Sequence, residues 1–150
     1  MKKVLPGLVL ISLFAACKRS NKDKLTNKWV VRKAVIYKGN KNWENDTIGM
    51  GNIVKAMENN INGQVYDLHA DGKFITSGKV KTVSGTWDVK DGTVQFLSDD
   101  FKQAIWNFKD NKIEIGQDSS LVANLQLGKD SMYVQLTLKP APGQAIKVDN

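Results

Sequence analysis

The segment that decides the fold is Val83-Ser84-Gly85-Thr86-Trp87-Asp88-Val89-Lys90-Asp91-Gly92-Thr93-Val94-Gln95-Phe96. Its apolar and small residues alternate with polar ones on both sides of Asp91-Gly92. Strict period-two alternation is typical of antiparallel strands that bury one face and expose the other. Asp-Gly readily adopts the positive φ angles of a tight hairpin turn. The segment therefore predicts a hairpin of two half-buried strands.

The same alternation continues along the chain before and after this hairpin. It covers residues 28–37, residues 65–69, Phe74-Ile75 beyond Asp71-Gly72, and then four later groups: Ala104, Trp106 and Phe108; Ile113 and Ile115 beyond Asp110-Asn111; Leu121, Ala123, Leu125 and Leu127; Met132, Val134, Leu136 and Leu138. A sheet of about nine consecutive strands has two exposed edges unless it closes on itself. We therefore predict an all-β fold, an antiparallel meander barrel of about eight to nine strands. A two-sheet sandwich is the second choice.

One segment has a helical period instead. Five apolar residues fall at offsets 0, 3, 4, 7 and 11, which is one face of a helix: Met50, Ile53, Val54, Met57 and Ile61. Asn52 is a candidate N-cap, and Asn62-Gly63 a candidate end. We predict one short helix between the first and second strands, either plugging one end of the barrel or forming a movable lid over a cavity.

The N-terminus has the layout of an export signal. Lys2 and Lys3 precede an apolar stretch over residues 4–16, and the small residues Ala15-Ala16 stand directly before Cys17. A helix that spans a membrane needs about 20 apolar residues, so this stretch is too short to be one. The order of charge, apolar core and small residues predicts a signal peptide that is cut before Cys17.

Cys17 is the only cysteine of the chain. The segment Leu13-Phe14-Ala15-Ala16-Cys17 resembles the bacterial lipobox, with Phe14 where leucine is usual. The resemblance implies that the Cys17 thiol receives a diacylglycerol and becomes the new N-terminus, so that acyl chains anchor the protein in a membrane. The predicted organisation is a signal peptide over 1–16, a lipidated cysteine and tether over 17–24, a barrel over 25–138 and a C-terminal tail over 139–150.

The positive charge of the chain lies mainly near its N-terminus. The whole sequence has a net charge of +7, but from Leu25 onward 16 basic and 14 acidic residues leave only +2. Interspersed charges of both signs are typical of a solvated surface and not of a phosphate-binding stripe. The charge pattern therefore predicts that no nucleic acid is a partner. The lipid on Cys17 predicts that a membrane is.

The strands resemble those of the bacterial lipocalin-like lipoproteins over residues 25 to 138. The resemblance rests on four short segments: Leu25-Thr26-Asn27-Lys28-Trp29, Leu68-His69-Ala70-Asp71-Gly72-Lys73-Phe74, Ser84-Gly85-Thr86-Trp87-Asp88-Val89 and Val134-Gln135-Leu136-Thr137-Leu138. Asn27 stands where the family usually has glycine. The resemblance implies a lipocalin-like barrel without a cofactor, resident in the outer membrane. Lys18-Arg19 form no acidic surface-export run after Cys17, which favours the periplasmic face. The resemblance also implies a non-catalytic role. The barrel pattern, the possible helical lid and the aromatic residues near the barrel ends favour binding of a small apolar or amphipathic ligand.

Aromatic and methionine residues are the candidate ligand contacts. Trp43 lies in a polar loop over 39–46, where it either contacts a ligand or partner or folds over the barrel mouth. The other candidates are Met50, Met57, Tyr66 and Trp106. Trp29 and Trp87 are expected in the core, where replacement by alanine costs about 3–5 kcal/mol.

No pattern for catalysis stands out. His69 is the only histidine, and it has Asp67 and Asp71 nearby in the sequence, but no nucleophile elbow accompanies it. A single histidine without a free cysteine is a poor basis for a metal site. We therefore predict that the protein is not an enzyme and has no metal. The alternative to ligand binding is a tethered structural or protein-interaction module of an envelope assembly.

Overall fold

The computed structural model describes residues 20–39, 41–42, 50–79, 81–98, 100, 103–126 and 132–144. Its helical elements are α1 (Asn21–Leu25), α2 (Met50–Ile61) and the short 3-10 helix η1 (Lys109–Asn111). Its strands are β1 (Lys28–Lys38), β2 (Lys41–Asn42), β3 (Val65–Leu68), β4 (Lys73–Ser77), β5 (Val83–Lys90), β6 (Thr93–Ser98), β7 (Ala104–Asn107), β8 (Leu121–Gln126) and β9 (Met132–Pro140).

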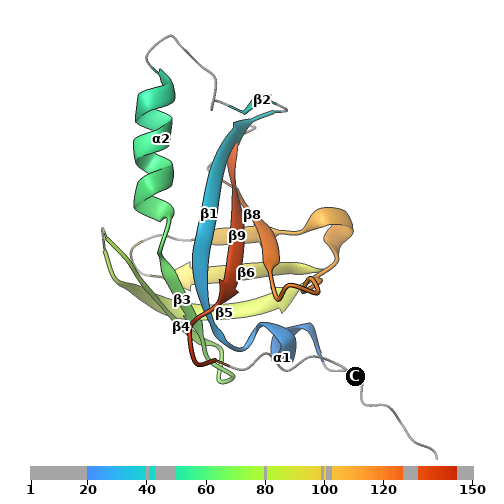
Figure 1. Cartoon of the computed structure of the whole chain (residues 1–150). Helices are drawn as coiled ribbons and strands as arrows, with labels where there is room; N and C mark the ends of the chain where they lie inside the picture. Colours follow the sequence, from blue (N-terminus) through green and yellow to red (C-terminus); the bar gives the residue numbers. More distant parts are fainter. Residues whose placement is uncertain are drawn as a thin grey trace, which may run out of the picture.

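The strands form one closed antiparallel barrel (Figure 1). From β3 to β9 each strand pairs with the next along the chain, β1 pairs with β3, and β9 returns to pair with β1. The closing ladder runs from Trp29 opposite Pro140 to Lys38 opposite Met132. The two-residue strand β2 pairs only with the end of β1. Within the described residues the barrel thus has eight strands, which confirms the predicted meander barrel with one short helix after its first strand.

The hairpin between β5 and β6 has the turn that its sequence predicts. Asp91 and Gly92 have φ angles of 50° and 73°. Lys90 lies opposite Thr93 on either side of them. Two consecutive residues with positive φ match the right-handed twist of the flanking strands, so the turn joins them without distortion.

A second glycine allows β5 and β6 to approach closely. A Cβ atom on Gly85 would lie 1.9 Å from the backbone oxygen of Leu97, far inside any van der Waals contact. Gly85 lies opposite Ser98 on β6 and opposite Phe74 on β4. Only glycine fits this position, and glycines of this kind mark bends that help a sheet close.

A bulge in β1 keeps its apolar residues inside the barrel. The register with β9 shifts between Val31 and Lys33. Arg32 and Lys33 are both exposed, whereas Val31 before them and Ala34 after them are buried. The extra residue changes the phase of the alternation, which bends the strand and returns Ala34 and Ile36 to the interior.

The barrel interior is a single apolar core. Trp29 and Trp87 are 0% and 2% exposed, which confirms their predicted place there. The other fully buried side chains include Leu25, Val31, Ile36, Leu68, Phe74, Val94, Phe96, Trp106, Leu121, Leu136 and Leu138. These side chains come from α1 and from each of the eight strands of the barrel.

Folded elements of the barrel domain extend past its predicted bounds at both ends. The tether was expected to continue to residue 24, but α1 begins at Asn21 and is packed on the barrel through Leu25, which is fully buried. The tail was expected from residue 139, but β9 continues to Pro140, and the Ala141 amide donates to the Lys28 carbonyl oxygen. Both ends of the barrel domain therefore extend beyond the alternating pattern.

Two local predictions also differ from the structure. Ile113 and Ile115 were expected in a strand, but only an isolated bridge from Ile115 to Leu121 forms there. The preceding Asp110 and Asn111 have φ angles of 54° and 53°, so the chain turns through η1 without forming a ladder. The helix α2 begins at Met50, two residues before the predicted N-cap Asn52.

Candidate functional site

Two of the predicted ligand contacts lie in the centre of the core. Tyr66 and Trp106 are 7% and 1% exposed. The ring centroids of Tyr66 and Trp106 lie 4.8 Å apart, and Phe96 lies 4.8 Å from Trp106 and 5.1 Å from Phe74. These edge-to-face contacts are favourable geometries for aromatic pairs. In this structure the rings of Tyr66 and Trp106 contact one another and their neighbours, and their predicted contact with a ligand stays a prediction.

The phenol of Tyr66 stays neutral in this environment. Burial raises the pKa of the Tyr66 hydroxyl, because the charged form loses its solvation. The hydroxyl lies 3.5 Å from Oε1 of Gln64, a long contact for a hydrogen bond. Tyr66 therefore behaves as a packing residue with a weakly held polar end.

Two further predicted contacts among the described residues, Met50 and Met57, lie on α2. Met50 and Met57 are 48% and 44% exposed, and Ile53 on the same helix face is 57% exposed. We call Met50, Ile53 and Met57 the α2 stripe. Helical spacing places Ile53 on this apolar face, although Ile53 is not among the predicted ligand contacts. Three large apolar side chains exposed side by side on one helix are a candidate surface for binding.

The helix α2 lies beside the upper half of β1 and does not lie across the barrel end (Figure 1). Its Val54 side chain is buried in the barrel core. Two polar side chains, one on α2 and one directly after it, accept hydrogen bonds from β1: Glu58 Oε1 from the Ile36 amide at 2.8 Å, and Asn62 Oδ1 from the Ala34 amide at 2.8 Å. β1 pairs with β3 only up to Val30, so on that side the rest of β1 has no ladder with β3. The bonds from Glu58 and Asn62 take the place of the hydrogen bonds that β3 would otherwise make there.

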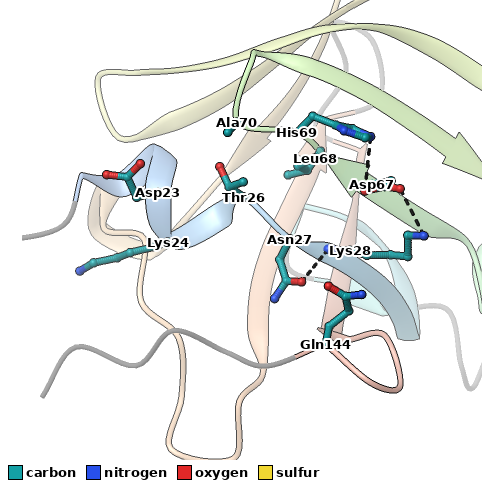
Figure 2. A pocket seen from close by; sticks show the side chains of 10 residues that line it. All are labelled: Asp23, Lys24, Thr26, Asn27, Lys28, Asp67, Leu68, His69, Ala70 and Gln144. Carbon is teal, nitrogen blue, oxygen red and sulfur yellow. Dashed lines mark hydrogen bonds and ion pairs between the residues drawn. The ribbon is translucent and has the colours of Figure 1, made fainter.

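A polar pocket opens at the other end of the barrel (Figure 2). Its volume is about 340 Å³. Its lining comes from α1, the start of β1, the end of β3 and the segment after β9: Asp23, Lys24, Thr26, Asn27, Lys28, Asp67, Leu68, His69, Ala70 and Gln144. We call it the α1 pocket.

The helix α1 forms one wall of the α1 pocket and is held firmly in place. Ser20 and Asp23 form a capping box, in which the Asp23 amide donates to Ser20 Oγ at 3.2 Å. The indole N–H of Trp29 donates to the Leu25 carbonyl oxygen at 2.9 Å. A five-residue helix is too short to be stable alone, so these contacts with the barrel keep it folded.

A carboxylate lies between two basic groups on the opposite wall of the α1 pocket. Asp67 Oδ2 lies 3.3 Å from Lys28 Nζ, and Asp67 Oδ1 lies 3.5 Å from His69 Nε2 (Figure 2). The side chains of Lys28 and His69 are more than 40% exposed, so these contacts contribute little to stability. The Lys28 ammonium places a positive charge next to the Asp67 carboxylate in the pocket.

Of the three candidate catalytic residues, Asp67 and His69 form a pair, and Asp71 interacts mainly with Lys73. Asp67 and His69 are in contact, but Asp71 accepts a hydrogen bond from the Lys73 amide, which holds the pKa of the Asp71 carboxyl below its usual value. Among the described residues that line the α1 pocket, Thr26 alone carries a hydroxyl. Among the described residues, no three His, Cys, Asp or Glu side chains gather in a way that suits a metal ion.

His69 also borders an apolar groove on the outside of the barrel. The groove has a volume of about 410 Å³ and lies along β4 and β5. It is lined by His69, Lys73, Phe74, Ile75, Ser84, Gly85 and Thr86. Ile75 is 43% exposed. The exposed apolar side chains of the described chain thus occur at α2 and on the outer strand faces, outside the core.

The remaining predicted residues, Cys17 and Trp43, lie outside the described residues. Among the described helices, none has the length and apolar character to cross a bilayer. No protein-family model, no curated protein and no solved structure matches this chain significantly.

Proposed function

We propose that this chain is a non-catalytic, lipocalin-like lipoprotein of the bacterial cell envelope that binds a small apolar or amphipathic molecule along α2. Its acylated Cys17 anchors it in the outer membrane, facing the periplasm. The observation that supports binding at α2 is the exposure of Met50, Ile53 and Met57 next to one another on a helix that is attached to the barrel through the buried Val54. The support for the anchor is the leader with its small residues before Cys17.

The packing of the core favours α2 over the barrel centre as the binding surface. Tyr66, Phe74, Phe96 and Trp106 contact one another in the interior, and each is at most 7% exposed. A ligand among these rings would have to separate them and lose their mutual contacts. The α2 stripe needs no such rearrangement.

The geometry of the stripe sets the kind of ligand. Met50 and Met57 are seven residues apart, which corresponds to about 10 Å along a helix. Each of the three side chains is about half exposed, and covering them contributes about 1 kcal/mol apiece. A total of about 3 kcal/mol corresponds to weak binding, so a tighter ligand must also contact neighbouring residues. An elongated apolar molecule with one polar end fits these requirements.

A fluorescent probe tests the proposal. The dye N-phenyl-1-naphthylamine, which brightens on entering an apolar site, is titrated into the protein and into two variants. Ile53→Asp places a charge within the α2 stripe and is expected to weaken dye binding about tenfold, equivalent to about 1.4 kcal/mol. Leu97→Asp is the matched control, because Leu97 is 51% exposed on β6, away from α2. Equal loss in both variants, or none in Ile53→Asp, contradicts binding at α2.

The second candidate is a tethered protein-interaction module. An exposed apolar helix face is also what a hydrophobic groove of a protein partner recognises. A photoreactive amino acid at position 53, compared with position 97 in living cells, separates the candidates. A reproducible protein adduct at position 53 alone supports the interaction module, whereas a small molecule retained in native mass spectrometry supports the first candidate.

A further inference from the structure

The helix α1 fixes the point at which the chain leaves the barrel. Lys22 Nζ lies 3.1 Å from Asp88 Oδ1 on β5 and 5.3 Å from the centre of the Trp87 ring. Leu25 is fully buried at the other end of the helix. These contacts and the capping box at Ser20 hold residues 20–25 on the barrel surface.

The length of chain before Ser20 limits how far the barrel can move from an anchored Cys17. Three peptide steps separate these residues, and a fully extended chain covers at most about 11 Å over that distance. Without α1, the free chain would extend from Cys17 to Leu25, a reach of at most about 29 Å. The packing of α1 therefore shortens the free segment between Cys17 and the barrel, which we call the leash, to less than half of that reach.

We propose that the α1 end of the barrel is a membrane-facing surface, which rests on the lipid head groups while α2 points away from the bilayer. This inference depends on the proposed lipidation of Cys17. The α1 end consists of α1, the turn 70–72 and residues 141–144, and each of these three segments contributes to the lining of the α1 pocket: Asp23, Lys24, Ala70 and Gln144. Figure 1 shows α1 and the turn between β3 and β4 at one end of the barrel, with α2 at the other.

The chemistry of the α1 end suits the polar surface of a membrane. The α1 pocket presents both Lys28 and Asp67, and the apolar groove along β4 begins beside it at His69. Four lysines and four aspartates lie in or beside this end: Lys22, Lys24, Lys28, Lys73, Asp23, Asp67, Asp71 and Asp88. These charges of the folded end balance, whereas Lys18 and Arg19 in the leash add a charge of +2. We therefore infer that the short leash, and not the charge of the folded end, sets the orientation. We expect this orientation to persist when the salt concentration is raised from about 0.1 M to about 1 M, which shortens the Debye length from about 10 Å to about 3 Å.

The orientation leaves the α2 stripe accessible. A stripe pressed against the bilayer would be covered by lipid, whereas a stripe on the far side meets molecules of the aqueous compartment. The proposed ligand or partner therefore approaches from the side opposite to the anchor.

Energy transfer to the membrane surface tests the orientation with the full lipidated chain. Ala70→Cys at the α1 end and Lys55→Cys on α2 are both exposed positions for a donor dye. Each labelled protein is placed on phosphatidylcholine vesicles that carry rhodamine on a fraction of their head groups. The Ala70→Cys label is expected to lose most of its emission to the acceptor and the Lys55→Cys label to keep most of its own, at low and at high salt.

Failure of the orientation and failure of the lipidation give different results. Equal transfer from both positions, or stronger transfer from position 55, on vesicle-bound protein overturns the orientation and leaves the proposed lipidation intact. A contrast that disappears at high salt overturns control by the leash. A protein that takes up two dyes per chain and fails to float with the vesicles has a bare Cys17 thiol, and this result overturns the lipidation together with the orientation.

Discussion

Replacing Gly85 with alanine tests whether the barrel closes as described. The added Cβ would lie 1.9 Å from the Leu97 backbone oxygen, 2.9 Å from the Leu97 carbonyl carbon and 2.9 Å from Cε1 of Phe74. Ordinary contact begins at 3.4 Å, so the backbone oxygen must move by about 1.5 Å, the difference of the two distances. Backbone atoms of a paired strand cannot yield as a flexible side chain does, because the ladder between β5 and β6 would have to open.

The expected cost follows from these distances. Overpacking typically destabilises a protein by about 1–3 kcal/mol, and the lower entropy of the unfolded alanine chain offsets about 0.4–1 kcal/mol of this. We expect Gly85→Ala to lower the free energy of unfolding by about 2 kcal/mol, and Tm by roughly 6–8 °C for a domain of this size.

A matched glycine provides the control. A Cβ on Gly78 would meet Gln64 Cγ at 3.4 Å, which is ordinary contact. Gly78→Ala should therefore change the free energy of unfolding by less than about 0.5 kcal/mol. Urea titration, followed by tryptophan fluorescence and circular dichroism, measures both variants. If Gly85→Ala is as stable as Gly78→Ala, then β5 and β6 do not approach as described and the reasoning is refuted.

Three further predictions concern the two helices. The Lys22 ammonium holds the pKa of Asp88 below its usual 3.8. The pair therefore stabilises the fold fully above pH 3.8, and this stabilisation is lost as the pH falls through the lower pKa of the folded state. Asp88→Asn should remove this part of the acid sensitivity, and a Tm that depends on acid pH as in the wild type would contradict the prediction. Glu58→Ala should lower the free energy of unfolding by about 1–2 kcal/mol and speed hydrogen exchange at the Ile36 amide, whereas Glu58→Gln keeps an acceptor and so keeps this amide protected. Equal exchange at Ile36 in both variants would exclude the hydrogen bond from Ile36 to Glu58. Trp29→Phe should cost about 1–3 kcal/mol in urea titrations, because the Leu25 carbonyl oxygen loses its buried donor; wild-type stability would show that the bond is absent.

Alternation and turn residues were enough to predict the barrel. Buried positions repeat every two residues in β4, where Phe74 and Thr76 are buried between exposed neighbours. The Asp91-Gly92 turn depends only on local backbone preference. The register shift after Val31 was not predicted, because a bulge depends on the partner strand as well as on the strand itself.

The ends of the domain were predicted less well for a different reason. Ser20 and Asp23 have the spacing of a capping box, but the surrounding lysines resemble a polar tether. The helix forms because Leu25 finds a place in the core and Trp29 donates to its carbonyl oxygen. Such tertiary contacts are not visible in a local pattern.

The candidate site was predicted in part. Helical spacing correctly placed Met50 and Met57 on one face of a helix, but it did not show which part of that face is covered by β1. Alternation placed Tyr66 and Trp106 inward, but it does not show whether a barrel interior is filled or hollow. In the structure the rings around Trp106 fill this part of the interior.

The most direct test of binding on α2, outside a packed barrel core, is a nuclear magnetic resonance titration of the protein with an apolar probe. We expect shifts confined to the amides of α2 and adjoining β1, with the indole signal of Trp106 unchanged. Shifts at Tyr66 and Trp106 with an unperturbed α2 would contradict this expectation, because the ligand would then lie inside the barrel.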